Sequence, residues 1–176
     1  MTKSLPILSL LAVASLSSAQ SWSFELLHPA PTTAPAGQVI GWGYTVTNDS
    51  ADRWLLLNSL QFAFDEPPAV DASSALFDYP LLAPGESRTR SFVWGVSGMF
   101  WLKFDDDTLP GDTCQGTPSL GGAWYDGDPS AAGNYLEPSS IIDQRFSATV
   151  QAVPEPASMM ALALGAVNLL RRRKRA

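Results

Sequence analysis

The amino-acid sequence predicts an all-β protein, an antiparallel β-sandwich, over residues 20–152. Apolar side chains alternate with small or polar ones in several short runs, as they do in a strand with one buried face. Clusters of Pro, Gly and Asp separate these runs, and the region between the chain ends lacks the spacing of an amphipathic helix. The chain has 176 residues, of which 45% are hydrophobic and 16% charged, so it can bury one sizeable core.

The first long run of alternating residues begins at Ile40. Ile40, Trp42, Tyr44 and Val46 are large and apolar, and the residues between them are Gly or Thr. Because successive side chains of a strand point to opposite faces, we expect these four residues to face the core and the Gly and Thr residues to face outward. Asn48-Asp49-Ser50 is a turn signal that ends the strand.

A second apolar strand and a tight turn follow. Residues 55–64 form an apolar run in which Leu60, Phe62 and Phe64 alternate, and Asp-Glu-Pro-Pro at 65–68 ends it. Residues 83–86 place Pro and then Gly at the two central positions. A type II turn requires this arrangement, because its third residue has a positive φ.

After this turn, residues 87–96 alternate again. Every second residue falls on one face: Arg88, Arg90, Phe92, Trp94 and Val96. We therefore expect one strand that begins at a polar sheet edge and continues into the core.

Two further strands complete the predicted sandwich. The first is short and carries Phe100, Leu102 and Phe104. The second is the last of the domain and carries Ile142, Phe146, Ala148 and Val150. The residues between them, 105–137, are expected to form a long loop.

The turns of this region carry a family resemblance. Thr45-Val46-Thr47-Asn48 at a strand end and a later Leu82-Ala83-Pro84-Gly85-Glu86 turn resemble the immunoglobulin-like accessory domains of bacterial surface proteins. The resemblance covers residues 38–96 and implies an immunoglobulin-like topology for the sandwich.

The N-terminus has the three parts of a secretory signal peptide, residues 1–19. Lys3 supplies the positive charge, residues 5–16 are apolar, and Ser17-Ser18-Ala19 ends in small residues, so cleavage is expected between Ala19 and Gln20. A helical signal peptide of this kind implies Sec-type export machinery. The alternative is a buried N-terminal helix.

The C-terminus, residues 153–176, also has three parts. Pro154, Glu155 and Pro156 break any preceding strand. Residues 157–170 are apolar and, as a helix, would span about 21 Å, less than the hydrocarbon core of about 30 Å. Five basic residues follow: Arg171, Arg172, Arg173, Lys174 and Arg175. Such a cluster stops transfer and stays in the cytoplasm, and snorkelling side chains let a short transmembrane helix fit.

This tail resembles the PEP-CTERM sorting signal, which consists of a Pro-Glu-Pro motif, a short transmembrane helix and a basic end. The resemblance implies recognition by an exosortase, a membrane transpeptidase of Gram-negative bacteria that make exopolysaccharide. It also implies transient insertion in the inner membrane, removal of the tail, and delivery to the cell surface or extracellular matrix. The alternative is a membrane anchor that is never processed.

The composition of residues 20–152 excludes several classes of function. This region holds sixteen acidic and five basic residues, a net charge of about −11, which opposes binding to nucleic acid. The single cysteine, Cys114, cannot form an internal disulfide. It is expected to be a free thiol in a loop, or else to bridge two chains. One cysteine and one histidine, His28, cannot build a zinc site of the usual kind.

Acidic residues in the expected loop form a candidate Ca²⁺ site, because Ca²⁺ takes six to eight oxygen ligands. The candidate ligands are Asp105, Asp106, Asp107, Asp112, Asp126 and Asp128. The alternative is a solvated acidic loop without a metal. No other cofactor is expected.

Three aromatic residues near these acids are candidate sugar-binding platforms: Trp101, Trp124 and Tyr125. An exposed aromatic ring stacks on a sugar, and neighbouring carboxylates accept its hydroxyl hydrogens. The alternative is that the tryptophans belong to the core.

The sequence favours an exported, non-catalytic protein of the cell surface or extracellular matrix. It has no Gly-x-Ser-x-Gly elbow and no phosphate-binding glycine loop, and His28 is placed as a surface residue rather than a general base. The alternative is a calcium-assisted carbohydrate-binding module, with exopolysaccharide as a candidate partner. A secreted hydrolase is the third hypothesis.

Overall fold

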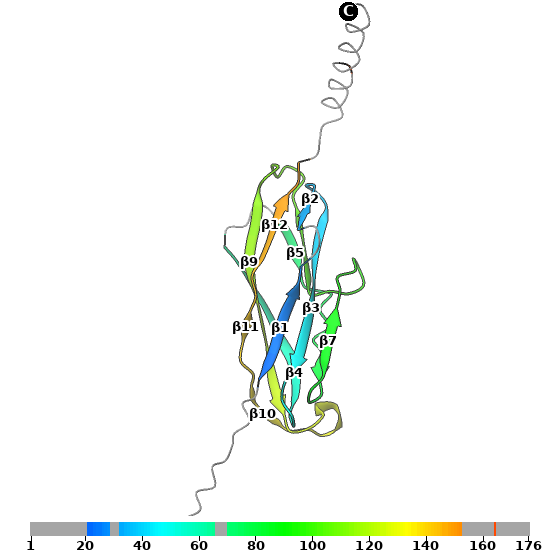
Figure 1. Ribbon diagram of the computed structural model, residues 1–176, viewed down its shortest axis with the longest axis vertical. Helices are drawn as coiled ribbons and strands as arrows, with labels where there is room; N and C mark the ends of the chain where they lie inside the picture. Colours follow the sequence, from blue (N-terminus) through cyan, green and yellow to red (C-terminus); the bar gives the residue numbers. More distant parts are fainter. Residues whose placement is uncertain (1–20, 29–31, 66–69, 153–163, 165–176) are drawn as a thin grey trace, which may run out of the picture.

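The computed structural model describes residues 21–28, 32–65, 70–152 and 164, and in this part the chain forms two sheets around one core (Figure 1). The first sheet has the order β1 (Trp22–Leu27), β3 (Val39–Asn48), β8 (Phe100–Phe104) and β5 (Val70–Ser73), with β7 (Ser87–Arg90) paired to β3. The second has the order β2 (Thr33–Ala34), β12 (Phe146–Val150), β9 (Thr113–Tyr125), β4 (Trp54–Phe64) and β6 (Leu81–Leu82). On its β9 strand also lie β10 (Tyr135–Pro138) and β11 (Ile142–Asp143).

The prediction of an all-β, antiparallel region is confirmed. Among the described strands, β2 and β12 alone run parallel. The helical content of residues 70–152 is one 3-10 turn, Pro129–Ala131. The expected helices at the two chain ends, residues 1–19 and 157–170, lie outside the described residues apart from Leu164.

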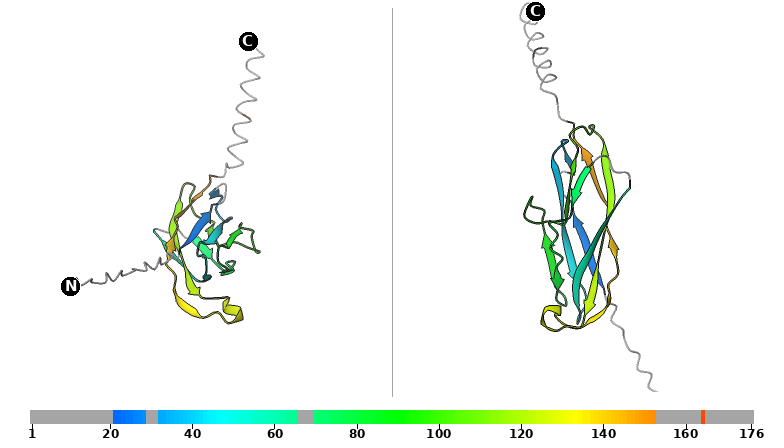
Figure 2. Two further views of the ribbon diagram at one scale, coloured as in Figure 1. Left: turned by 60° about the horizontal axis from the view of Figure 1, so that its bottom comes forward. Right: turned by 180° about the vertical axis from the view of Figure 1, so that it is seen from behind.

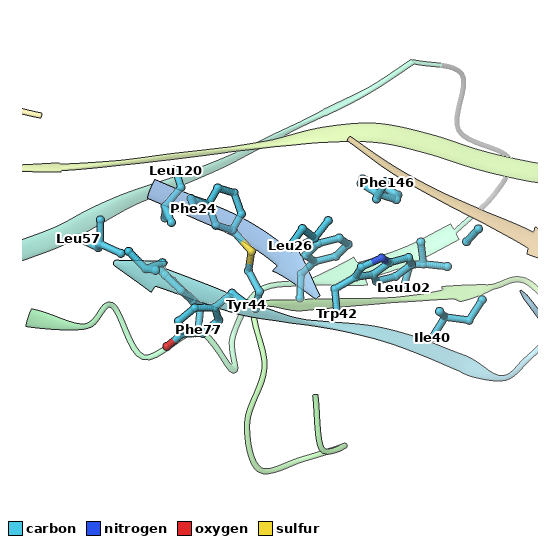
Figure 3. Close-up of a cluster of buried hydrophobic side chains, with 14 of the residues drawn as sticks. Phe24, Leu26, Ile40, Trp42, Tyr44, Leu57, Phe77, Leu102, Leu120 and Phe146 are labelled. Carbon is cyan, nitrogen blue, oxygen red and sulfur yellow. The ribbon is translucent and has the colours of Figure 1, made fainter. Parts of the chain in front are cut away.

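β3 confirms the alternation read from the sequence. Ile40, Trp42, Tyr44 and Val46 are all buried. Figure 3 shows the first three of them in the core between the sheets. Trp42 stacks on Phe100 with ring centroids 4.7 Å apart, and its ring also lies 5.3 Å from that of Phe146 on the second sheet. The centre of the core is therefore an aromatic cluster contributed by β3, β8 and β12.

The expected loop over residues 105–137 is wrong, because β9 occupies its middle. β9 is the longest strand and pairs with β4 over most of its length. The glycines of β9 interrupt the alternation of apolar and polar residues, so the pattern did not predict this strand. Close packing nevertheless requires one of them, because a Cβ at Gly122 would lie 2.3 Å from the Leu56 carbonyl oxygen. The absence of a side chain at this position lets β4 and β9 approach each other.

The expected strand over residues 87–96 is only half correct. β7 ends at Arg90, and the second half of the run leaves the sheet. The last strand is also shorter than expected, because Ile142 belongs to β11 and the chain resumes pairing at Phe146. The tight turn at 83–86 is confirmed: Gly85 has a φ of 71°, and the Glu86 amide donates to the Ala83 carbonyl over 3.0 Å.

The end of β3 is fixed by a buried side chain, Asn48. Its amide nitrogen contacts the carbonyl oxygens of Arg53 at 2.7 Å, Ala83 at 3.0 Å and Leu82 at 3.2 Å. Its side-chain oxygen accepts from the Ser50 amide at 3.0 Å. One side chain therefore joins the end of β3 to two other segments of the backbone, residues 50–53 and 82–83.

Replacing Asn48 with Ala should destabilise the domain by about 3 kcal/mol, because buried carbonyl groups would lose their donor. The measurement is thermal or denaturant unfolding. Asn58→Ala is the matched control, since Asn58 is exposed on β4 and should shift stability by less than about 0.5 kcal/mol. Equal shifts in the two variants would contradict the role given to Asn48.

Candidate functional site

A loop interrupts the first sheet between β7 and β8. The Asn48 amide donates to Glu86, and the Trp42 carbonyl accepts from Met99 over 2.8 Å. Residues an even number apart in a strand bond to the same side, so β7 and β8 follow one another along one side of β3. Tyr44 pairs with Arg90, but Trp42 pairs with Phe100 rather than Phe92. Residues 91–98 are therefore an eight-residue loop inserted between β7 and β8, which would otherwise form one continuous strand beside β3.

The loop is attached to the sheet through Phe92. A Cβ at Gly41 would lie 2.2 Å from the Phe92 ring, and a Cβ at Gly98 would lie 2.7 Å from it. Gly41 faces outward, as the alternation predicts, but it is buried because this ring covers it. Because Gly41 has no side chain, the Phe92 ring can pack directly on β3 and hold the loop against the sheet.

The tip of the loop is a tight hairpin that exposes apolar side chains. The Val93 amide donates to the Ser97 carbonyl over 2.8 Å, the Ser97 amide donates back over 3.0 Å, and Gly95 between them has a φ of 72°. Val93, Trp94 and Val96 are 50%, 57% and 74% exposed. In Figures 1 and 2 the loop projects from the side of the first sheet.

Trp94 meets Trp101 of β8 at a right angle. The ring centroids lie 5.1 Å apart with an interplanar angle of 80°, and we name this pair the aromatic corner. Trp101 is half-buried on the outer face of the sheet, where its register partners are Gly41 and Ser73. The next outward pair in the register is Lys103 with Asp71. Aromatic and polar side chains thus share one surface.

The structure does not bring the three predicted aromatic ligands together. Trp124 is only 2% exposed and belongs to the core, so the alternative stated for it holds and its ring is not an exposed platform. Tyr125 is half-buried at the end of β9 on the second sheet, with its ring centroid 6.0 Å from that of Tyr135. Trp101 alone faces outward on the first sheet. Its partner Trp94 was expected in a strand.

The six candidate Ca²⁺ ligands form two groups at opposite ends of β9 (Figure 1). Asp105, Asp106, Asp107 and Asp112 precede the strand, and Asp126 and Asp128 follow it. They cannot act as one site, because the whole length of β9 separates the two groups. No set of three or more Asp, Glu, His or Cys side chains in the described part of the chain is placed to hold a metal ion.

Several of these carboxylates satisfy nearby backbone groups instead. Asp112 accepts from the Leu109 amide at 3.0 Å, and Asp128 accepts from the Ser130 amide at 2.8 Å. Asp126 accepts from both the side chain and the amide of Asn134, and these hydrogen bonds lower the pKa of the Asp126 carboxyl. The acids therefore shape the loops in which they stand.

The groups suited to acid–base chemistry take part in structural contacts. His28 Nδ1 accepts a hydrogen bond of 3.3 Å from the indole N–H of Trp42. Tyr44 donates to Asp78, and burial together with that carboxylate raises the pKa of Tyr44. Asp78 is in turn held by Arg88 and Arg90, each 3.6 Å away.

An apolar cavity of about 470 Å³ opens between β4 on one side and β5 and β8 on the other. Its lining is Phe62, Phe64, Phe100, Leu102 and the four small residues from Ala72 to Ala75. None of these lining residues, all from the described part of the chain, is ionisable.

Cys114 is buried in β9, so the expectation of a thiol in a loop is wrong. Its side chain is part of the core, which leaves no access for a bridge to a second chain while the domain is folded. Burial raises the pKa of the thiol to about 11.

Native Cys114 should therefore react with a thiol reagent at pH 8 roughly 100-fold more slowly than the unfolded chain, from its lower thiolate fraction alone. A raised pKa in the folded state also means that stability is lost as pH rises, here between the ordinary value near 9 and the folded value of about 11. Labelling kinetics in buffer and in denaturant test the first point, and melting from pH 8 to 11 tests the second. Rapid labelling of the native protein would contradict burial.

The folded domain ends where the tail begins. The Val150 amide donates to the Asp112 carbonyl and the Gln151 amide to the Ala34 carbonyl, both over 2.8 Å. The predicted tail residues 153–176 lie outside the described residues apart from Leu164, as do Ala19 and Gln20. Within the described ranges, no helix is long and apolar enough to cross a membrane.

Comparison with known families identifies the tail. Residues 152–175 match the PEP-CTERM protein-sorting motif, so the predicted resemblance is confirmed. No curated protein matches the chain. The chain therefore carries a sorting signal of the exosortase type, which implies export and membrane-associated sorting, and the signal starts one residue after the last hydrogen-bonded residue of the domain.

Proposed function

We propose that this chain is a non-catalytic protein of the cell surface or extracellular matrix, which Sec-type machinery exports and an exosortase-type transpeptidase then releases from the inner membrane of a Gram-negative bacterium. The observation that carries the proposal is the sorting motif at residues 152–175. The position of β12 supports it, because the whole folded domain precedes the motif and would be translocated before the basic end stops transfer.

The test is the intact mass of the protein recovered from each cell fraction. We expect a species that begins near Gln20, ends near Pro154–Pro156 and lies outside the inner membrane. A species that still carries Arg171–Arg175 and remains in the inner membrane would identify a plain anchor and would overturn the surface or matrix assignment.

The second candidate function is carbohydrate binding by the folded domain. The exposed ring of Trp94 beside the outward-facing, half-buried ring of Trp101 favours it, because a sugar stacks on an accessible aromatic face. A Ca²⁺ ion that assists binding would have to be held either by the acids before β9 or by those after it. A melting temperature unchanged by millimolar Ca²⁺ would remove the metal from this proposal, and a rise would retain it.

The non-catalytic assignment is supported by the contacts of His28, Tyr44 and Asp78, which serve the core and the edge of the first sheet. The immunoglobulin-like topology remains part of the proposal, and the two sheets around one core are compatible with it. A hydrolase would instead show an activity that is lost when one particular acid is replaced. Such a result would replace the non-catalytic proposal.

A further inference from the structure

We propose that the aromatic corner, together with the polar side chains beside it on the first sheet, binds neutral pyranose units of a polysaccharide. This inference rests on the second candidate function and assigns it a site. The site lies on Trp94 and Trp101 and does not use Trp124 or the acids at the ends of β9.

The loop that carries Trp94 is not needed to complete the sheet. Arg90 pairs with Tyr44 and Phe100 pairs with Trp42, so a chain without residues 91–98 would continue the pairing without a break. The loop instead exposes three of the nine large hydrophobic residues that are exposed in the described part of the chain, within four positions. A concentrated apolar patch on an ordered, projecting loop indicates a contact surface.

The geometry of the patch suits a sugar ring. Of the two register neighbours of Trp101, Gly41 lies under the Phe92 ring, whereas Ser73 is small, so no large side chain of β5 lies directly beside Trp101. Trp94 stands at 80° to it and forms the second wall of a corner. A pyranose has an apolar face that can stack on one ring, while its equatorial hydroxyls point sideways to polar partners.

Those polar partners are present on the same surface. Ser73 lies in register with Trp101, and Asp71 and Lys103 form the next outward pair. They offer a hydroxyl, an acceptor and a donor, which is the mixture that sugar hydroxyls require. Ser73 Oγ accepts from the Ala75 amide over 3.2 Å, so its hydroxyl can still donate to a sugar oxygen.

The charge of the domain selects a neutral ligand. Residues 20–152 carry a net charge of about −11, and Lys103 is the one basic side chain on the outward register positions beside Trp101. An anionic polymer or an anionic membrane surface would be repelled, as would a second copy of the same domain. A neutral polysaccharide incurs no such repulsion.

The experiment is electrophoresis of the full chain through native gels that contain hydroxyethylcellulose, laminarin, galactomannan or dextran. A polyoxyethylene detergent keeps the tail in solution without adding sugar. We expect retardation by at least one polysaccharide, and about tenfold weaker binding in Trp94→Ala and in Trp101→Ala, the upper range for one aromatic contact. Tyr135→Ala is the matched control, because Tyr135 is also 57% exposed but belongs to β10 on the second sheet, and it should bind normally.

Trp94→Ala keeps the test valid even if Trp101→Ala destabilises the fold, since Trp94 is exposed and its loss should leave the melting temperature nearly unchanged. Retardation that both tryptophan variants retain would overturn this site and leave carbohydrate binding standing. No retardation of the unmodified chain in any gel would overturn carbohydrate binding itself. A concentration-dependent dimer lost in Trp94→Ala, without retardation, would assign the loop to self-association. None of these outcomes changes the sorting test by intact mass.

Discussion

Replacing Trp42 with Ala should lower the melting temperature of the protein by about 15 °C, from a loss of about 4 kcal/mol. Trp42 is fully buried and stacks on Phe100, so the substitution removes the largest side chain from the point where the two sheets meet (Figure 3). The indole N–H also donates to His28, and that contact is lost with the ring. A loss of this size is a large share of the 5–15 kcal/mol that stabilises a typical domain.

The matched control is the same substitution on the surface. Trp94→Ala removes an equally large side chain that is 57% exposed, and the melting temperature should change by less than about 2 °C. Thermal unfolding followed by circular dichroism measures both variants. If Trp42→Ala melted within a few degrees of the parent, or if the two variants shifted equally, the placement of Trp42 in the core and of Trp94 outside it would be contradicted.

The two tryptophans also show what the sequence can and cannot predict. The alternation around Trp42 is a property of one strand with one buried face, so β3 could be predicted from the sequence alone. The alternation around Trp94 continues the same pattern, yet it belongs to a loop. The periodicity of a sequence does not show whether a partner strand lies beside it. Here the residues that pair with β3 change from Arg90 directly to Phe100.

Gly95 and Gly98 were the available signal for this loop. Both have a positive φ, 72° and 150°, which an extended strand does not use. Glycine also occurs inside strands, as Gly41 and Gly122 do here, so the sequence alone could not distinguish a glycine in a loop from a glycine in a strand.

The prediction that the six candidate Ca²⁺ ligands share one loop was wrong for a related reason. Asp112 and Asp126 are fourteen residues apart, a separation that a loop would allow to close and a strand does not. β9 was hidden by its glycines and by Pro118, which disfavour strands in general. Because β9 is a strand, four of the six carboxylates lie before it and two lie after it. The same strand places Trp124 in the core.

Replacing Pro154, Glu155 and Pro156 together with Ala should abolish release of the protein from the inner membrane. We expect the uncut species, which retains Arg171–Arg175, to increase at least tenfold, because the matched motif begins at residue 152 and its defining tripeptide would be lost. Two prolines favour an extended backbone, which is the form that a protease cleft binds. Intact mass by fraction measures the ratio. Glu25→Gln, at an exposed glutamate of β1, is the control and should leave processing unchanged.

The geometry of the domain end sharpens this prediction. Gln151 is hydrogen-bonded to Ala34, and three residues further along the chain is Pro154. A fully extended chain covers about 10 Å over three residues, so a transpeptidase that recognises the motif must work close to the end of β12. A Gly-Ser spacer inserted after Ala152 should therefore leave the motif functional and increase the yield of cut protein. Unchanged cleavage of the triple Ala variant would show that the tripeptide is not the recognised element, whereas loss of cleavage with the spacer would show that the enzyme also reads the folded end of the domain.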